Sequence, residues 1–228
     1  YSNDTATAAV KGPLSLARTS LAATGNSSFG YFGGGGPSAV STVDRIDYSN
    51  DTATASVKGP LSLAKSILAA TGNASFGYFG GGSPGTISTV QRIDYSNDTA
   101  TALVKGILSV NVQSLAATGN ASFGYFGGGD TGPKTTVSRV DYSNDTATAT
   151  VRGPLSAARY NLAATGSSSF GYFGGGGPSA KSTVERIDYS NDTATATVRG
   201  PLSVGRNGLA ASSSRANAIL TENIINYA

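Results

Sequence analysis

Basic side chains recur at one position of the sequence, at intervals of 47 residues or twice that spacing. They are Arg18, Lys65, Arg159 and Arg206, and Val112 occupies the remaining place in the series. Guanidinium and ammonium groups that converge on one point bind carboxylates, phosphates or sulfates. The alternative is that each cation bonds to backbone carbonyls of its own segment. The series therefore predicts either an anion site or a repeated structural contact.

Acidic side chains recur in the same way, in the phrase "DYSND". Asp47, Asn50 and Asp51 lie close enough together to suggest calcium, but an EF-hand needs a longer loop with a Gly and a bidentate Glu. Asx side chains that cap a tight turn explain the same letters. Arg45 and its copies alternate with Asp47 and its copies, which predicts ion pairs between neighbouring repeats. We expect no metal and no cofactor.

The composition excludes several kinds of chemistry. The chain contains no Cys and no His, so the usual zinc, copper and iron ligand sets are absent, as are Ser-His and Cys-His nucleophile pairs. Glu occurs only at Glu185 and Glu222, and no carboxylate pair stands out from the repeats. The net charge is +3, without a basic run, and no apolar stretch approaches a membrane span. We therefore expect a protein that is not an enzyme and binds neither nucleic acid nor membrane.

These residues belong to a tandem repeat of 47 residues. The phrase "YSNDTATA" begins at Tyr1, Tyr48, Tyr95, Tyr142 and Tyr189. Each unit contains four short strand signals divided by turn signals: "LAATG" (21–25), "SFGYFGG" (28–34), "STVDRIDY" (41–48) and "TATASVK" (52–58). No window shows the period of a helix. Four strands per repeat of this length are typical of a β-propeller blade.

The phrase "FGYFGGG" is interpreted as packing. Phe76 and Tyr78 point to one side of a strand and Phe79 to the other, as a sheet between two neighbours requires. The glycines leave room for the adjoining sheet. The phrase lacks the Lys-Ser/Thr end of a phosphate-binding loop. The inner strand "LAATG" has the small residues expected where strands crowd around an axis.

The unit resembles a kelch repeat. "PLSLAR" (13–18), "YFGG" (31–34) and "TVDRID" (42–47) stand in the kelch order, although the kelch Trp is missing and Ile46 replaces its Tyr. The resemblance implies a kelch-like β-propeller over essentially the whole chain. The near-identical arrays also resemble tandem repeats encoded by marine bacteriophages, which implies a virion surface or tail-associated protein and an extracellular location.

The predicted fold is a single all-β domain, 1–228, forming a five-bladed propeller with four antiparallel strands per blade. The N-terminal strand is expected to complete the last blade and so remove an open sheet edge. The predicted blades are 13–59, 60–106, 107–153, 154–200, and 201–228 together with 1–12. The alternative is an open fragment of a larger ring.

Sequence differences among the repeats collect at two places: the pair that follows the basic position, and the loop between the second and third strands. Both belong to one face of a propeller, and loops on a rigid scaffold are where binding residues concentrate. The predicted ligand-binding residues on this variable face are Arg18, Thr19, Ser20, Lys65, Ser66, Ile67, Gln113, Ser114, Lys134, Arg159, Tyr160, Asn161, Lys181, Arg206 and Asn207.

The sequence therefore predicts a non-catalytic binding module, monomeric by itself, whose variable face binds a protein or an anionic glycan. The alternative function is that of a lectin-like propeller with one sugar site per blade. A multivalent lectin would keep its pocket residues identical in every repeat, whereas a protein-binding face would vary them. The variable pairs favour the first reading, and drift at loop tips is the alternative to any binding role.

Overall fold

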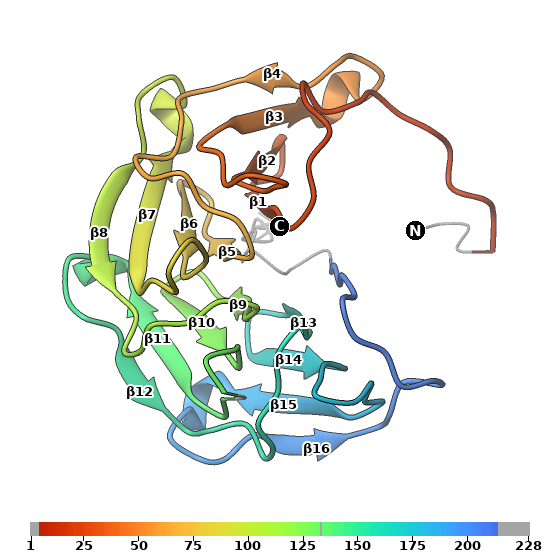
Figure 1. The fold of residues 1–228 in the computed structure, drawn as a ribbon, viewed down its shortest axis with the longest axis vertical. Helices are drawn as coiled ribbons and strands as arrows, with labels where there is room; N and C mark the ends of the chain where they lie inside the picture. The colour runs from red at the N-terminus through yellow and green to blue at the C-terminus, as the bar shows by residue number, and fades with distance from the viewer. Residues whose placement is uncertain (1–4, 133, 214–228) are drawn as a thin grey trace, which may run out of the picture.

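The chain forms a β-propeller with four blades. The computed structural model describes residues 5–132 and 134–213. Its strands pair into four separate sheets of four antiparallel strands each, and in every sheet the spatial order follows the chain order. The sheets stand around a common axis as an arc that is open between the first and last blades (Figure 1). In each sheet the first strand lines the axis, and the fourth strand is the edge strand at the rim.

The strand bounds repeat closely from blade to blade. Blade 1 consists of β1 (Ala22–Gly25), β2 (Phe29–Gly33), β3 (Val43–Asp47) and β4 (Ser56–Val57). Blade 2 consists of β5 (Ala69–Gly72), β6 (Phe76–Gly80), β7 (Thr89–Asp94) and β8 (Leu103–Ile107). Blade 3 consists of β9 (Ala116–Gly119), β10 (Phe123–Gly127), β11 (Val137–Asp141) and β12 (Thr150–Arg152). Blade 4 consists of β13 (Ala163–Gly166), β14 (Phe170–Gly174), β15 (Val184–Asp188) and β16 (Thr197–Arg199).

The outer strands are shorter than expected because a turn precedes them. "DYSND" forms a 3-10 turn, as at η1 (Tyr48–Asn50), and the carboxylate of Asp47 accepts a hydrogen bond from Ser49 N at 2.9 Å. The turn recurs as η2 (Tyr95–Asn97), η3 (Tyr142–Asn144) and η4 (Tyr189–Asn191). The prediction that Asx residues cap this turn is confirmed.

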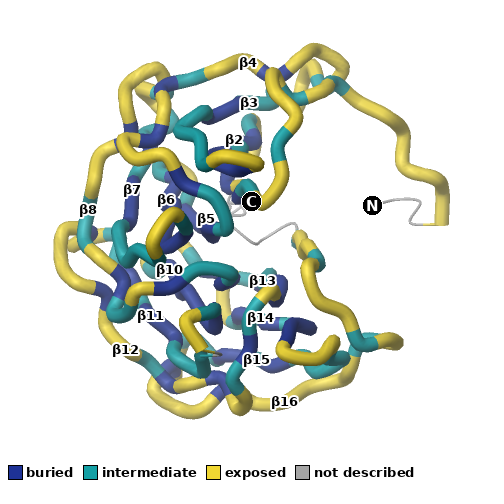
Figure 2. The backbone as a smooth tube through the Cα atoms, viewed as in Figure 1, coloured by how far each residue is buried: buried dark blue, intermediate teal, exposed yellow. Residues whose placement is uncertain are grey.

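The aromatic phrase packs one blade against the next, as predicted. Phe79 is fully buried and lies against Gly33 of the preceding blade, where an added Cβ would come within 2.6 Å of its ring. Tyr78, on the opposite side of β6, stacks on Tyr142 of the following blade with ring centroids 4.5 Å apart. The core therefore lies between blades, where the dark blue strands of Figure 2 are.

A polar cluster at the outer part of each junction supports this packing. Asp145 accepts a hydrogen bond from Tyr78 Oη at 3.0 Å and from Arg92 at 2.7 Å, and Lys105 Nζ lies 3.3 Å from its second oxygen. The same cluster forms around Asp98 and Asp192. Arg45, Arg92 and Arg139 thus form the expected ion pairs between repeats, but their partner is the Asp at the end of the turn.

The prediction of five blades was wrong, because residues 5–132 and 134–213 form four. The described part of the fifth repeat, 201–213, contains no strand, and neither does the N-terminal segment 5–12. Residues 216–222, at the place where the other repeats carry the aromatic phrase, read "ANAILTE" and lack its Phe and Tyr side chains. The rest of the predicted blade, 1–4 and 214–228, lies outside the described residues.

The N-terminal segment does not close the ring. Instead of joining a sheet, it bonds to the turn of blade 1: Gly12 N donates to Asp51 O at 2.8 Å, and Lys11 lies 3.2 Å from the Asp51 carboxylate. Val10 is 97% exposed. An outer strand needs its own third strand as a partner, and segment 5–12 has none among the described residues.

Candidate ligand-binding face

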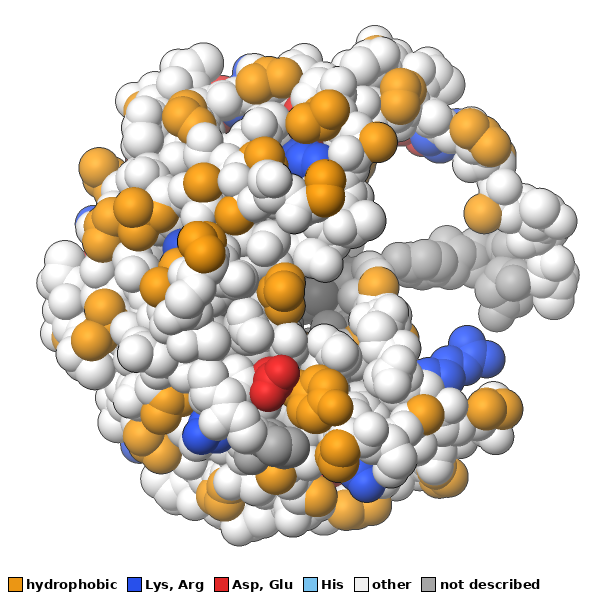
Figure 3. Space-filling view, viewed as in Figure 1, with side chains coloured by type: hydrophobic (Ala, Val, Ile, Leu, Met, Phe, Trp, Pro, Cys, Tyr) orange, Lys and Arg blue, Asp and Glu red, His pale blue; other side chains and the backbone are white. Residues whose placement is uncertain are grey.

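The propeller brings the variable pair of each repeat beside the variable loop of the same blade. Thr19 bridges to Gly36, Ser66 to Ser83, and Gln113 to Asp130, in isolated antiparallel bridges. In blade 4 the equivalent contact is a hydrogen bond from Gly177 N to Tyr160 O at 2.7 Å. The two segments that vary most among the repeats therefore form one continuous surface, which we call the variable face and which faces the viewer in Figure 3.

The second residue of each pair surrounds the mouth of the central channel. These residues are linked in succession by backbone hydrogen bonds of 2.8–3.0 Å, from the N–H of each repeat to the carbonyl of the one before. The series runs through Ser20, Ile67, Ser114, Asn161 and Gly208. The fifth repeat thus contributes its entry segment to the mouth, although it forms no blade in the described residues.

All five residues at the mouth have a left-handed backbone. Their φ values are 54° at Ser20, 55° at Ile67, 57° at Ser114, 51° at Asn161 and 63° at Gly208. Gly adopts this conformation without steric cost, whereas a β-branched residue such as Ile rarely does. Four repeats nevertheless place a side chain there. Strained backbone of this kind clusters at functional sites, so the mouth is a candidate contact point.

The mouth is a shallow cavity of about 310 Å³, visible as the hollow at the centre of Figure 3. The five mouth residues form its rim, and five leucines line it further in: Leu21, Leu68, Leu115, Leu162 and Leu209. None of the described residues that line it is charged. The residue types of the rim vary among the repeats, whereas the leucines are constant. The cavity therefore departs from the symmetry of the repeats only at its rim, where a ligand would make its first contacts.

Two of the three arginines of the predicted anion site, Arg18 and Arg159, point into their own blades. Arg18 is fully buried, bonds to Thr42 O at 2.9 Å and forms an ion pair of 2.6 Å with Asp44. Arg159 bonds in the same way to Thr183 O at 3.0 Å and pairs with Glu185. Arg18 and Arg159 thus follow the alternative interpretation, in which the cation bonds to backbone carbonyls.

Lys65 is a buried cation that faces no carboxylate. Its Nζ donates to Thr89 O at 2.6 Å, and the group opposite is the neutral amide of Gln91, which bonds to Ser62 and Leu63. Burial lowers the pKa of Lys65 to about 7. At the third position the residue is Val112, and Ser138, which takes the place of Asp44 and Glu185, bonds to Ser109 Oγ at 2.6 Å. A carboxylate is therefore present only in the blades whose basic residue is Arg.

The remaining predicted cations lie toward the solvent. Arg206 is exposed, while Lys134 and Lys181 are half-buried. Backbone bridges join Lys134 to Arg159 and Lys181 to Arg206, so these residues connect the variable loop of one blade with the entry segment of the next. Asn207 is exposed beside Arg206. Positive charge on the variable face is therefore concentrated near blade 4.

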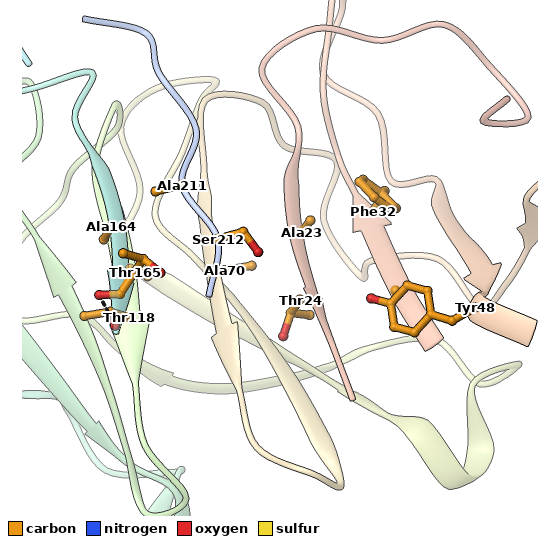
Figure 4. A pocket seen from close by; sticks show the side chains of 12 residues that line it. Ala23, Thr24, Phe32, Tyr48, Ala70, Thr118, Ala164, Thr165, Ala211 and Ser212 are labelled. Carbon is orange, nitrogen blue, oxygen red and sulfur yellow. Dashed lines mark hydrogen bonds between the residues drawn. The ribbon is translucent and has the colours of Figure 1, made fainter. Parts of the chain in front are cut away.

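The opposite end of the channel has a different lining. A cavity of about 310 Å³ is bordered there by the inner strands, whose residues are mostly Ala and Thr (Figure 4). Thr118 donates to Thr165 O at 3.1 Å across neighbouring blades. Phe32 and Tyr48, on the side of blade 1 that borders the open part of the arc, also line it. Among the described residues that line this cavity, Tyr48 is the one ionisable residue, so they offer no titratable pair suited to acid–base chemistry.

Within the described residues, no group of three His, Cys, Asp or Glu is placed to hold a metal ion. The helical turns in the same residues are too short to cross a membrane. No family model matches the chain, and no curated protein matches its sequence.

Two features of the site were missed from the sequence. One is the left-handed backbone at the mouth, for which Gly208 in the fifth repeat was the available signal. The other is the partner of the basic position: Asp44, Gln91, Ser138 and Glu185 stand in register 26 residues after it. Because acids appear at this position only where the earlier residue is Arg, the pairing could have been inferred from their joint variation.

Proposed function

We propose that this β-propeller is a non-catalytic binding scaffold whose variable face binds a protein partner. One observation carries the proposal. The strong differences among the repeats lie on one face, while the turns on the other face keep the phrases "TGN" and "DYSND" almost unchanged. Variation confined to loops on a repeated frame is the pattern of a recognition surface.

The chemistry of the face favours a protein over an anionic glycan. Arg18, Lys65 and Arg159 hold their charges inside the blades, which leaves Lys134, Lys181 and Arg206 for any anion. No two repeats carry the same variable pair, so a small ligand bound once per blade would meet a different site each time. A single large partner that spans several blades can use all of these differences.

The resemblance to phage-encoded repeats and to kelch repeats supports a location on a virion surface or tail. Gold-labelled antibody against the chain should then decorate intact virions in electron micrographs of the source. Labelling found only on host material would count against this location without affecting the binding proposal.

The binding proposal is tested by converting the face of blade 4 into that of blade 1. The triple variant Tyr160→Thr, Asn161→Ser, Lys181→Val uses only residues that blade 1 already tolerates at these positions. Proteins captured from the source organism by the wild-type chain should be lost with this variant. Ser167→Asn, which restores the common turn on the opposite face, is the matched control and should retain them. Equal capture by all three chains would refute the proposal.

A further inference from the structure

The face opposite the variable face has a cavity at a junction between blades. It lies between blades 2 and 3, has a volume of about 380 Å³, and is lined by residues of the "TGN" and "DYSN" turns and the starts of the adjoining strands. The main lining residues are Asn73, Phe76, Ser122, Phe123, Asp141 and Ser143. Cavities of this size accommodate small ligands.

The polar groups of the cavity have fixed orientations. Asp141 Oδ1 accepts hydrogen bonds from Ser143 N at 2.9 Å and from Ser143 Oγ at 2.7 Å. These bonds lower the pKa of Asp141, so the carboxylate is ionised at neutral pH. Asn73 Oδ1 accepts from the N–H groups of Ser75 and Phe76 at 2.9 Å, so its amide NH₂ remains as a donor, with a long contact of 3.4 Å to Ala121 O.

Aromatic surface completes the cavity. Phe76 and Phe123 are half-buried, and each is covered on one side by a guanidinium group 4.2 Å from the ring centroid. Those two arginines, Arg92 and Arg139, are paired with Asp145 and Asp192. The carboxylate of Asp141 is therefore the charge that a ligand would meet, and it disfavours anionic ligands.

The cavity residues recur at every junction between described blades. Junction 1–2 has Asn26, Phe29, Ser75, Phe76, Asp94 and Ser96 in the same places, and junction 3–4 has Asn120, Phe123, Ser169, Phe170, Asp188 and Ser190. Capping accounts for the Asn and Asp. It does not account for the constant exposed Ser at Ser75, Ser122 and Ser169, where only the backbone is needed for the turn. A site repeated without change is what several copies of one small ligand require.

We infer that each junction binds the ring of one neutral sugar. A carboxylate, an amide donor and two hydroxyls match the adjacent hydroxyl groups of a pyranose, and the phenyl surface of Phe76 and Phe123 matches its apolar C–H groups. This inference does not depend on the proposed function, because the two sites lie on opposite faces. Three described junctions give an expected capacity of about three sugars per chain.

The test counts bound sugars by native mass spectrometry, with the methyl glycosides of glucose, galactose, mannose, fucose and N-acetylglucosamine as probes. We expect one of them to load the chain to about three copies, with a dissociation constant of about 1 mM, typical of a single weak contact set. Ser122→Trp, which fills one cavity from an exposed position, should reduce the maximum by one copy. Ser75→Trp and Ser169→Trp should each do the same.

The controls separate this site from the variable face. The triple variant Tyr160→Thr, Asn161→Ser, Lys181→Val should bind sugar like the wild type. Thermal melts establish whether each Trp variant is folded. Because three Trp variants are measured independently, the test still gives a result if one of them does not fold. Absence of binding to all five probes, a single copy per chain, or an unchanged capacity in the folded Trp variants would overturn the inference.

Discussion

Individual residues behave differently here at equivalent positions, because the surroundings differ from blade to blade. Arg18 and Arg159 each face a carboxylate, but Lys65 faces the amide of Gln91. A buried ammonium group without a counter-charge favours its neutral form. Comparison of Lys65 with Arg18 and Arg159 therefore measures the free-energy cost of burying a charge without a counter-charge.

Lys65→Met should change how stability depends on pH. The pKa of Lys65 is lowered from 10.5 to about 7 in the folded chain, so protonation opposes folding. The wild-type chain has its full stability above pH 10.5, where Lys65 is neutral in both the folded and the unfolded chain. As the pH falls toward 7, the unfolded chain binds a proton that the folded chain does not, so the free energy of unfolding decreases by at most about 1.4 kcal/mol per pH unit, with no further change below pH 7. Urea unfolding between pH 7 and 10 should show the Met variant gaining on the wild type as the pH falls. Parallel curves would contradict this.

Ile67→Gly should stabilise the chain. Ile67 has a φ of 55°, where a β-branched side chain costs about 1–2 kcal/mol and Gly costs nothing sterically. The greater freedom of Gly in the unfolded chain offsets about half of this gain. We expect a net gain of about 0.5–1 kcal/mol in urea unfolding. Ile107→Gly, in the extended strand β8, should destabilise instead, and a loss at both positions would contradict the strain argument.

At the scale of the strand, the glycines and aromatics of the middle strand determine how blades fit. An added Cβ at Gly80 would come within 2.7 Å of the buried Phe126 ring, whereas at Gly174 it would meet only Val184 Cγ2 at 3.5 Å. The two positions have the same sequence context, but within the described residues only Gly80 lies against a neighbouring blade. They form a matched pair.

Gly80→Ala should cost about 1–3 kcal/mol, because Phe126 has no free space to move into. Gly174→Ala should be neutral or slightly stabilising, since it restricts the unfolded chain without a clash. Thermal or chemical unfolding of the two variants measures the difference. Similar losses in both would show that this strand is intolerant for another reason.

Asp145→Ala should be far more damaging than Asp51→Ala. The Asp145 side chain is 8% exposed and bonds to Tyr78, Arg92 and Lys105. Its removal leaves two partly buried cations and the Tyr78 hydroxyl without their acceptor, which should cost about 3–5 kcal/mol. Asp51 is 42% exposed and pairs only with Lys11, which is worth less than about 1 kcal/mol. Unfolding midpoints of the two variants should separate accordingly.

The strands were largely predictable because the same strand and turn signals occur in each of the four complete repeats. The middle strand was expected over 28–34 and observed as Phe29–Gly33, and the two-sided packing of Tyr78 and Phe79 was read from alternation alone. The outer strand was expected over 52–58 but covers Ser56–Val57. The alternation of Thr and Ala is typical of a strand, but these residues instead connect the Asp-capped turn to the outer strand at the rim.

At the scale of the molecule, the propeller was predicted and the number of blades was not. Counting repeat phrases gave five, but a blade needs a complete sheet, and the sequence of the fifth repeat departs from the common phrase after Ala211. Its entry segment still follows the common path, with Leu202 N bonded to Ser182 O at 2.7 Å and Arg206 N to Lys181 O at 3.0 Å. A local signal was therefore taken as evidence for a whole unit.

The variable face was located from the sequence, but the direction of its side chains was not. Antiparallel pairing alone placed the variable pair and the variable loop on one side. Whether Arg18 points to the mouth or into the blade depends on Asp44, 26 residues later in the chain. Such pairings follow from three-dimensional register, which a single repeat does not reveal.

The central claim is that one face of a constant frame is a binding surface. It is tested most directly by measuring partner affinity for a chain in which every variable pair is the Thr-Ser of the first repeat. The substitutions are Ser66→Thr, Ile67→Ser, Gln113→Thr, Tyr160→Thr, Asn161→Ser, Asn207→Thr and Gly208→Ser. We predict an unchanged circular dichroism spectrum with at least a hundredfold loss of affinity for the captured protein. Wild-type affinity in this uniform chain would contradict the account.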